Sequence, residues 1–519
     1  MNNRLLFILI IVVLLLAGGE NQNAIANNIN ITNVVLVAGG YTDYTYVQCD
    51  ISWDHSWRAS WLETNVIPNV NVTNWDAAWV FVKYRIEGGA WQRASLSTTN
   101  NEHVAPAGAT INAGLSTNAS GSNFGVGVFL YRSAEGSGSW TNTIKLRWSY
   151  AQDGVLSTSR VDVSVHTIEM VYVPQGSFYV GDGTSTSLQG QFENGKFTNA
   201  LQIISEDTIV LGGGLAGSLG NNNTSGMATN DDFNDTTSQT LPPEYPKGYN
   251  AFYCTKYEIS QGQWVDFFNM LTDDQKTNRD ITGGVYNTSG KGTDLETNRN
   301  AVAWTTGDAT CSTPDRACNF LSWADGVAYA DWAGLRPMTE LEYEKACRGP
   351  VIPVPNEYAW GNATITDTTG FNGTDGSGME TALPSGANCN YGNTDILGPV
   401  RVGIYATSTS GRIASGSTYW GVMEMSGNLR ERVVTLGSAA GRIFTGAVGD
   451  GNLSTRGDAD VTFWPDSSAS GAAFRGGDWN YTTTNLRVSD RRAAAYTSSN
   501  RYFLYGFRAV RHMSSVVMN

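Results

Sequence analysis

Short runs in which apolar and polar residues alternate dominate the first third of the chain. Alternation with a period of two is typical of half-buried β-strands. Clusters of Gly, Asn, Ser and Thr separate the runs, and such spacing is typical of a β-sandwich. We therefore predict an all-β sandwich domain over residues 27–165. Its strands are expected at Ile31–Val37, Tyr46–Trp53, Trp79–Ile86, Gly125–Tyr131, Ile144–Tyr150 and Val161–His166.

Several tryptophans in this region have two interpretations. They form either a flat platform for carbohydrate or part of the core between strands, and the sequence favours the core because large aromatic side chains are mostly buried. No set of residues typical of a catalytic site accompanies them. The residues are Trp53, Trp57, Trp75 and Trp79.

Helical spacing of apolar residues appears only in the second half of the chain. Tyr253–Leu271 predicts a strand followed by a helix, with Ser260 as its N-cap. Asn319–Trp332 predicts a second helix, and Thr339 with Glu342 forms a capping box for a third. Residues 184–244 are polar and predict a long surface insertion or flexible loop. A few helices in a mostly irregular β region predict an α+β fold for residues 166–513.

The first 26 residues have the pattern of a signal peptide. Arg4 precedes the apolar run Leu5–Ala17, and Ala24 and Ala26 suit a cleavage site. The run is shorter than the roughly 20 residues of a membrane-spanning helix. We therefore expect an exported protein, secreted or in the cell envelope, with no membrane span once the signal is removed.

Composition narrows the possible partners. The chain has 519 residues and a formal net charge of −14, and only 15% of its residues are charged. A nucleic-acid partner is not expected, because binding the phosphate backbone requires a basic surface. The excess of acidic over basic residues is compatible with a solvated extracellular surface or with the binding of cations.

Six cysteines are present, and export makes disulfides permissible. Cys311 and Cys318 close a short loop and are the preferred pair, with Cys254 and Cys347 as a second possibility. The sequence has no CxxC motif, so neither a thioredoxin-like site nor a zinc site built on paired cysteines is supported.

Seven motifs in the second part of the chain resemble the sulfatase-modifying-factor family, whose domain is that of the formylglycine-generating enzyme. They occur in the family's order between Ile168 and Arg511, interrupted by the polar insertion. The resemblance implies a variant of the C-type-lectin fold here. The motifs are MVYVPQGSFYVGD, YCTKYEISQGQW, WADGVAYADWAGLRPMTELEYEKACRG, YAWGN, GVMEMSGNLRE, FRGGDWN and GFRAVR.

The resemblance breaks at the residues that carry the family's chemistry. Enzymes of this family oxidise a sulfatase cysteine with two copper-binding cysteines that follow the Arg-Gly-Gly motif. The matching positions here hold Tyr481 and Leu486, and no cysteine follows Cys389. Thiolate is the reactive group and the ligand, so we expect no copper, and the sequence argues against an enzyme. A related branch uses histidine-bound iron, but no histidine lies between Ile168 and Arg511.

The resemblance also implies two structural calcium sites. Calcium binds carboxylate, amide and carbonyl oxygens. The alternative is that these residues form turns and surface charges. The first set consists of the side chains of Asn388 and Asp395 with the carbonyls of Cys389 and Leu397. The second set consists of the side chains of Glu424 and Glu431 with the carbonyls of Gly427 and Leu429.

The terminal segment Ala473–Arg511 is rich in aromatic residues and arginine. Such residues dominate the energetics of recognition sites. Some relatives of this fold bind ligands through the corresponding segment, so the resemblance implies a binding surface here. The alternative is that Phe503–Tyr505 forms a final buried strand. The candidate ligand-binding residues are Trp479, Tyr481, Arg491, Arg492, Tyr496, Tyr502, Phe503 and Tyr505.

These observations favour a binding or adhesion protein whose ligand is a protein or glycan at the cell surface. One alternative is a sulfatase-modifying-type oxidoreductase with altered chemistry. Another is a structural component of the cell envelope that assembles with copies of itself through its Asn-, Thr- and Gly-rich surface.

Overall fold

A computed structural model describes residues 29–37, 42–117, 121–183, 188–221, 224, 226–284, 290–392 and 395–512. The predicted signal peptide lies outside these residues. Most of the regular structure is β, and the helices are few and short. None of the helices in the described part of the chain is long and apolar enough to cross a membrane.

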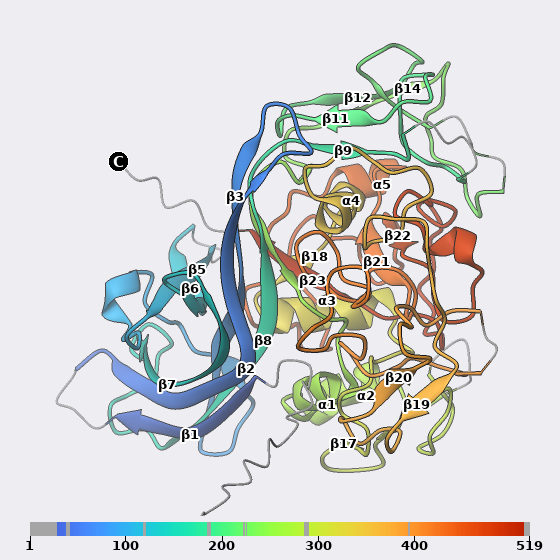
Figure 1. Ribbon diagram of the computed structural model, residues 1–519. Helices are drawn as coiled ribbons and strands as arrows, with labels where there is room; N and C mark the ends of the chain where they lie inside the picture. Colours follow the sequence, from blue (N-terminus) through green and yellow to red (C-terminus); the bar gives the residue numbers. More distant parts are fainter. Residues whose placement is uncertain are drawn as a thin grey trace, which may run out of the picture.

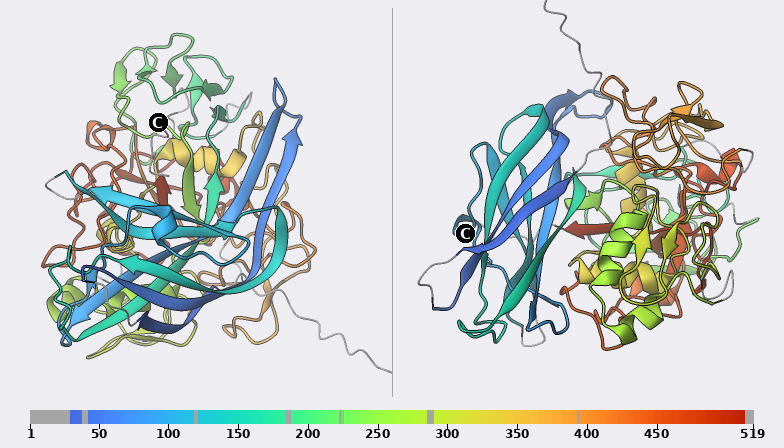
Figure 2. Two further views of the ribbon diagram at one scale, coloured as in Figure 1. Left: turned by 90° about the vertical axis from the view of Figure 1, so that its left-hand side faces the viewer. Right: turned by 90° about the horizontal axis from the view of Figure 1, so that it is seen from below.

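One large sheet of eleven strands runs through both halves of the molecule (Figures 1 and 2). Its main path has the order β1-β2-β3-β8-β15-β23-β18, and the remaining strands pair with β2, β3 and β6. The strands are β1 (Asn30–Val37), β2 (Thr45–Glu63), β3 (Val70–Ile86), β4 (Gln92–Arg93), β5 (Ala109–Thr117), β6 (Asn123–Arg132), β7 (Gly136–Trp148), β8 (Val161–Val173), β15 (Phe252–Thr255), β18 (Arg336–Pro337) and β23 (Ala509–His512).

The N-terminal region is all-β, and each run predicted from alternation lies wholly or mostly within one of these strands. Its strands are joined by hydrogen bonds in one connected sheet instead of being divided between two separate ones. Trp53, Trp75 and Trp79 are buried and Trp57 is half-buried. These side chains therefore serve the core, and they do not form an exposed carbohydrate platform.

Strand β8 joins the two halves of the molecule. It pairs with β3 from Asp76↔Val171 to Ile86↔Val161, and its C-terminal end also pairs with β15. Met170 therefore has a partner strand on each side. The predicted boundary at residue 165 falls inside this strand, which continues to Val173 beyond the predicted run Val161–His166.

Helices and short strands cover the C-terminal side of β8. The helices begin at the predicted N-caps Ser260 and Thr339, and each of these caps forms a complete capping box. The helices are α1 (Gln261–Asn269), α2 (Asp273–Arg279), α3 (Trp323–Trp332), α4 (Glu340–Arg348) and α5 (Ala439–Arg442), with 3₁₀ turns η1 (Asn100–Glu102) and η2 (Thr483–Leu486). Two-stranded ribbons are formed by β16 (Val302–Ala303) with β17 (Thr310–Cys311), β19 (Gly370–Asn372) with β20 (Thr381–Leu383), and β21 (Glu431–Val434) with β22 (Ala472–Arg475).

The polar insertion is more ordered than its composition suggested. It forms a small four-stranded sheet beside α4, at the top of Figure 1. Phe192, Leu211, Phe233 and Leu241 are buried beneath it and join the main core. A few well-spaced apolar residues are sufficient to fix a segment that is otherwise polar. The strands are β9 (Phe178–Val180), which pairs with β11 (Leu201–Ile203), and the sheet strands β10 (Glu193–Asn194), β13 (Leu219–Gly220), β12 (Ile209–Gly212) and β14 (Ser238–Leu241).

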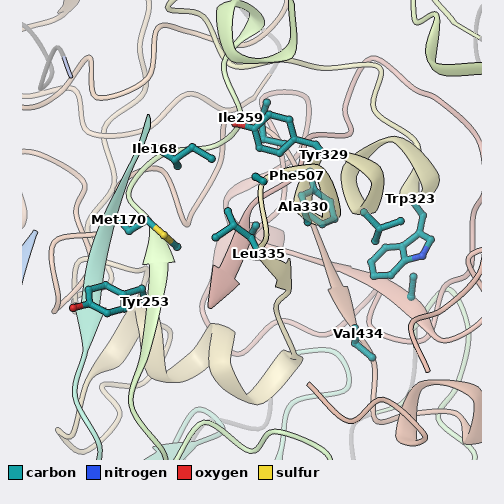
Figure 3. Close-up of a cluster of buried hydrophobic side chains, with 14 of the residues drawn as sticks. Ile168, Met170, Tyr253, Ile259, Trp323, Tyr329, Ala330, Leu335, Val434 and Phe507 are labelled. Atoms are coloured by element: carbon teal, nitrogen blue, oxygen red, sulfur yellow. The ribbon is translucent and has the colours of Figure 1, made fainter. Parts of the chain in front are cut away.

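The main core lies between the large sheet and α3. Figure 3 shows Ile168 and Met170 of β8 and Tyr253 of β15 on one side of this cluster, and Tyr329 and Ala330 of α3 across from them. The same cluster contains buried residues from both halves of the chain. The two halves are therefore packed around one shared core.

Trp79 lies where the N-terminal strands pack against the C-terminal half of the chain. Its indole Nε1 donates a hydrogen bond of 2.7 Å to the carbonyl of Ala333, and the Arg511 guanidinium lies 4.6 Å from its ring. A Cβ on Gly114 or Gly127 would come within 2.6 Å of the ring. These two positions in β5 and β6 therefore require glycine, because only glycine leaves room for the indole.

We expect Trp79→Ala to lower the free energy of unfolding by about 3–5 kcal/mol, the usual cost of removing a buried aromatic ring. Because the core is shared, the whole molecule should unfold in one transition that moves to lower temperature. Differential scanning calorimetry measures this, with the half-buried Trp91→Ala as control. Two separate transitions, of which only one moves, would contradict a shared core.

Candidate functional site

The terminal segment surrounds a cavity of about 440 Å³. Arg430, Phe474 and Asp490 form part of its wall, together with Asn480 and Asn485. The predicted ligand-binding residues that line it are Tyr481, Arg492, Tyr496, Tyr502 and Tyr505. The predicted residues that do not line it are Trp479, Arg491 and Phe503.

Backbone hydrogen bonds fix the segment against the loop that precedes β21. The Gly427 N–H donates to the carbonyl of Gly476, and the Trp479 N–H donates to the carbonyl of Asn428. Gly477 has a φ of 68°, and a Cβ there would lie 2.8 Å from the carbonyl oxygen of Asn485. Glycine is therefore needed for the turn that opens the cavity.

Tyr481 lies between two guanidinium groups. Arg430 is 4.0 Å and Arg492 is 5.4 Å from the centre of its ring. Arg430 is held in place by an ion pair with the buried carboxylate of Asp478. Cation–π contacts of this kind stabilise the ring and leave guanidinium N–H groups for a ligand.

Asp490 places a buried carboxylate in the same wall. One oxygen, Oδ1, accepts the Arg492 backbone N–H at 3.3 Å, whereas Oδ2 has no hydrogen-bond partner in the described part of the chain. Burial raises the pKa of Asp490 to about 6. At neutral pH this group is therefore an ionised, incompletely paired acceptor facing the cavity.

Arg491, which we predicted to bind the ligand, is buried and does not line the cavity. Its guanidinium is fully buried and forms ion pairs with Asp231 of the insertion, at 2.7 Å, and with Glu340 of α4, at 2.8 Å. Sequence neighbours in an irregular segment often face opposite ways, so Arg491 points into the core while Arg492 lines the cavity.

Two predicted aromatic residues also have other roles. Trp479 is buried and packs 5.5 Å from the half-buried Phe503. Leu504 and Tyr505 are buried as well, but they do not form the final strand, which is β23. Tyr505 lines the cavity and is also packed 4.4 Å from Phe474.

Sequence reasoning missed Arg430 and Asp490. Arg430 directly follows Leu429, which was assigned to a calcium site, and it lies in the motif GVMEMSGNLRE. Asp490 directly precedes the arginine pair. The sequence signal for Arg430 was its position inside a family motif, whereas Asp490 lies between two motifs. The approach of the Arg430 loop to the terminal segment is a long-range contact, which the sequence does not reveal.

The two positions that we predict to match the family's catalytic cysteines both lie within the described residues. Tyr481 lines the cavity, and Leu486 is fully buried in a core cluster that also contains Cys389. The Cys389 thiol donates to the carbonyl of Ser426 at 3.1 Å, and burial raises its pKa well above the usual range. Within the described part of the chain, the lining of the cavity contains no cysteine and no histidine.

The first calcium stretch does not present its oxygens as a ligand set. The Asn388 Oδ1 accepts the Thr366 N–H at 2.9 Å, and the Cys389 carbonyl accepts two hydrogen bonds of 3.0 Å from Thr368. Asp395 and Leu397 are exposed. The oxygens of Asn388 and Cys389 are therefore already used by the protein itself.

The second stretch fits a cation better. Glu424 and Glu431 are buried, and each has one carboxylate oxygen, Oε2, without a partner in the described residues. The other oxygens accept from the Gly403 N–H and the Arg508 guanidinium. Burial raises the pKa of Glu424 to about 7. A divalent cation at these carboxylates would offset the cost of burying them.

A different trio of carboxylates converges closely enough to hold a metal ion, and the sequence did not suggest it. Asp331, Asp450 and Asp460 each place an oxygen within 4.8 Å of the others. Both oxygens of Asp331 accept backbone N–H groups, from Asp450 and Asp460. The segment that contains Asp450 and Asp460 therefore holds the Asp331 carboxylate in place through its backbone N–H groups.

The predicted disulfide is not formed. All six cysteines are free thiols in the structure. The Cys311 thiol donates to Oε1 of Gln261 at 3.3 Å, and the Cys318 thiol donates to the carbonyl of Asn319 at 3.6 Å. Each sulfur has its own polar partner, and Cys254 and Cys347 are buried as separate free thiols.

We expect Arg491→Met to lower the free energy of unfolding by about 3–5 kcal/mol, because it leaves Asp231 buried without its cation and Glu340 paired with Arg475 alone. Arg492→Met, one residue along the chain, should change stability little because this side chain is half-buried. Urea unfolding of both variants measures the difference. Equal destabilisation by the two substitutions would contradict the conclusion that Arg491 stabilises the core whereas Arg492 only lines the cavity.

We expect Asp490→Asn to stabilise the fold near neutral pH. The folded-state pKa lies above the value of about 3.9 for a free carboxyl, so the folded state retains the proton and its stability falls as pH rises from about 4 to 6. The substitution should therefore add about 2–3 kcal/mol at pH 7 and almost nothing at pH 3. Urea unfolding at both values tests this, with the exposed Asp274→Asn as control.

Comparison with known proteins places these motifs in a family. Residues 157–513 match the model of the sulfatase-modifying factor enzyme 1-like domain, which is the FGE-sulfatase family. The chain is 32% identical to the formylglycine-generating enzyme of Bos taurus over 133 residues, 22% of this chain and 34% of that protein. It is 43% identical to the formylglycine-generating enzyme of Thermomonospora curvata over 56 residues, 11% of this chain and 18% of that protein.

Two further similarities were found. The chain is 33% identical to the hercynine oxygenase of Mycolicibacterium thermoresistibile over 98 residues, 19% of this chain and 18% of that protein. Among solved structures, Treponema denticola variable protein 1 aligns with a TM-score of 0.31 and 11% identity, over 67% of this chain and 96% of that one. The matched segments span between about a fifth and a third of the curated relatives. Because the family model covers more than half of the residues, this chain belongs to the sulfatase-modifying-factor (formylglycine-generating enzyme) family.

Proposed function

We propose that this protein is an exported binding protein that uses its formylglycine-generating-enzyme-like domain to hold a ligand, and not to oxidise cysteine. The observation that carries the proposal is the lining of the 440 Å³ cavity, which among the described residues contains tyrosines and arginines and no cysteine. The family resemblance matches Tyr481 in this lining to a catalytic cysteine. Thiolate chemistry requires a thiol at that place. The nearby Cys389 thiol is buried and held protonated, so it is not a substitute.

The cavity has the composition of a recognition site. Its tyrosines supply large rings with a polar end, and Arg430 and Arg492 supply charged donors. Tyrosine and arginine carry a disproportionate share of binding energy because they combine apolar area with hydrogen bonds. The ligand that fits this lining is a protein or glycan at the cell surface, because such a ligand offers oxygen acceptors to the guanidinium groups.

The division between rigid and accessible residues also supports binding. Arg475, which lines the cavity, and Arg491, which does not, are both fixed in buried ion pairs. Tyr481, Arg492 and Tyr496 retain solvent exposure. A binding site benefits from accessible side chains on a fixed support, because less conformational entropy is lost when the ligand binds.

Calcium belongs to this proposal as a structural ion at Glu424 and Glu431. Glu424 lies in the loop that precedes β21 and Glu431 is the first residue of that strand, and each has a spare oxygen. An ion that binds only the folded state would stabilise the domain.

The test is binding of the full exported chain to arrays of glycans and envelope proteins, with and without calcium. We expect at least one ligand whose affinity falls by more than tenfold in Tyr481→Ala and Arg492→Ala, the usual effect of losing a central contact. Tyr179→Ala and Arg85→Ala, outside the cavity, should leave it unchanged. Absence of any ligand, together with copper-dependent oxidation of a cysteine peptide, would overturn the proposal in favour of an oxidoreductase.

A further inference from the structure

A second cavity of about 350 Å³ lies at the junction of the N-terminal strands with α1 and α3. Phe81 of β3 and His166 of β8 line one side, and Tyr329 and Trp332 of α3 line another. Figure 3 shows Ile168, Ile259 and Tyr329, which also line the cavity, next to one another at one end of the core cluster. This cavity exists only because the N-terminal strands pack on the C-terminal unit.

The aromatic wall of this cavity is preorganised. The rings of Phe81 and His166 stack at 5.4 Å, and Trp332 lies edge-on to both of them at 5.0 and 4.9 Å. Burial lowers the pKa of His166 to about 3, so this imidazole is neutral. The wall therefore offers a fixed aromatic face to which His166 adds no positive charge. The buried Lys83 Nζ lies 5.7 Å from the Phe81 ring and 5.1 Å from the Trp332 ring.

Buried polar atoms without partners gather in the same cavity. They are Oγ1 of Thr167, Oγ1 of Thr255, Nε1 of Trp332 and Nε of Arg401, and none of them has a hydrogen bond within the described residues. The Arg401 Nη atoms donate to the carbonyls of Val402 and Glu380, which leaves Nε as the spare donor. Each unsatisfied buried group costs roughly 1–3 kcal/mol. Their convergence on one space indicates that a polar ligand satisfies them.

Carboxylates complete the lining at the solvent end. Asp266 and Asp315 are exposed residues of the cavity wall, so they mark its opening. Desolvation raises the pKa of Asp266, and no cation contributes to that shift. These groups are acceptors, whereas Trp332 and Arg401 are donors and the threonine hydroxyls are both.

We propose that this cavity binds a small polyhydroxylated ligand, a free monosaccharide or the terminal sugar of a glycan. A sugar presents hydroxyls that donate to Asp266 and accept from Trp332 and Arg401, and its C–H face packs on an aromatic ring. The volume lies at the lower end of ligand pockets, which start at about 300 Å³. An anion would face the carboxylates, and an apolar ligand would leave the buried donors unsatisfied.

The test uses the full exported chain and four probes: glucose, galactose, mannose and N-acetylglucosamine. Titration calorimetry should detect at least one of them. Thr255→Val should weaken binding about tenfold, the effect of one lost hydrogen bond. Its melting temperature should be unchanged or higher, because the hydroxyl has no partner to lose. Asp266→Asn should weaken binding similarly, whereas Asp274→Asn, on α2, should not.

A glycan array distinguishes the source of the sugar. Two results support the proposal: binding of free sugars, and binding of the terminal sugars of glycans without binding of free sugars. In either case Thr255→Val must weaken the binding. Absence of sugar binding, or binding of an organic amine such as choline in its place, would overturn it. Tyr481→Ala should leave this binding intact, so the outcome is independent of ligand binding at the cavity of the terminal segment.

Discussion

Buried pairs of arginine and carboxylate hold the C-terminal unit together. Helix α4 supplies Glu340 and Glu344, and both carboxylates are fully buried. Arg475 of β22 pairs with both of them, at 3.3 and 2.7 Å, and Arg491 of the terminal segment also binds Glu340. Such groups are costly to bury alone and are tolerated because each charge has several partners. The irregular loops around them therefore have a fixed attachment point without regular secondary structure.

The same network links segments that are far apart in sequence. Asp231 comes from the insertion and Arg491 from the terminal segment, and the two meet at 2.7 Å. Ala228 of the insertion lines the cavity with Arg492, and its N–H donates to the Arg492 carbonyl at 2.8 Å. The insertion is thus part of the wall of this cavity, and its polar composition reflects the ion pairs that it makes.

The elements with local signals could be predicted from sequence. The capping boxes at Ser260 and Thr339 mark helix starts because the cap and its partner are three residues apart. The family motifs likewise identified the domain. The continuous strand β8, the ordered insertion and the burial of Arg491 were not predicted, because each depends on contacts between segments far apart in the sequence. For the same reason the sequence indicated the tyrosines of the cavity but missed Arg430 and Asp490.

Strand β8 is bonded along both edges and runs from the N-terminal strands into the core behind the C-terminal unit. A pulling force applied between the two halves would load these hydrogen bonds together, in shear, before the halves could separate. The shared sheet therefore opposes separation of the two halves through its backbone hydrogen bonds.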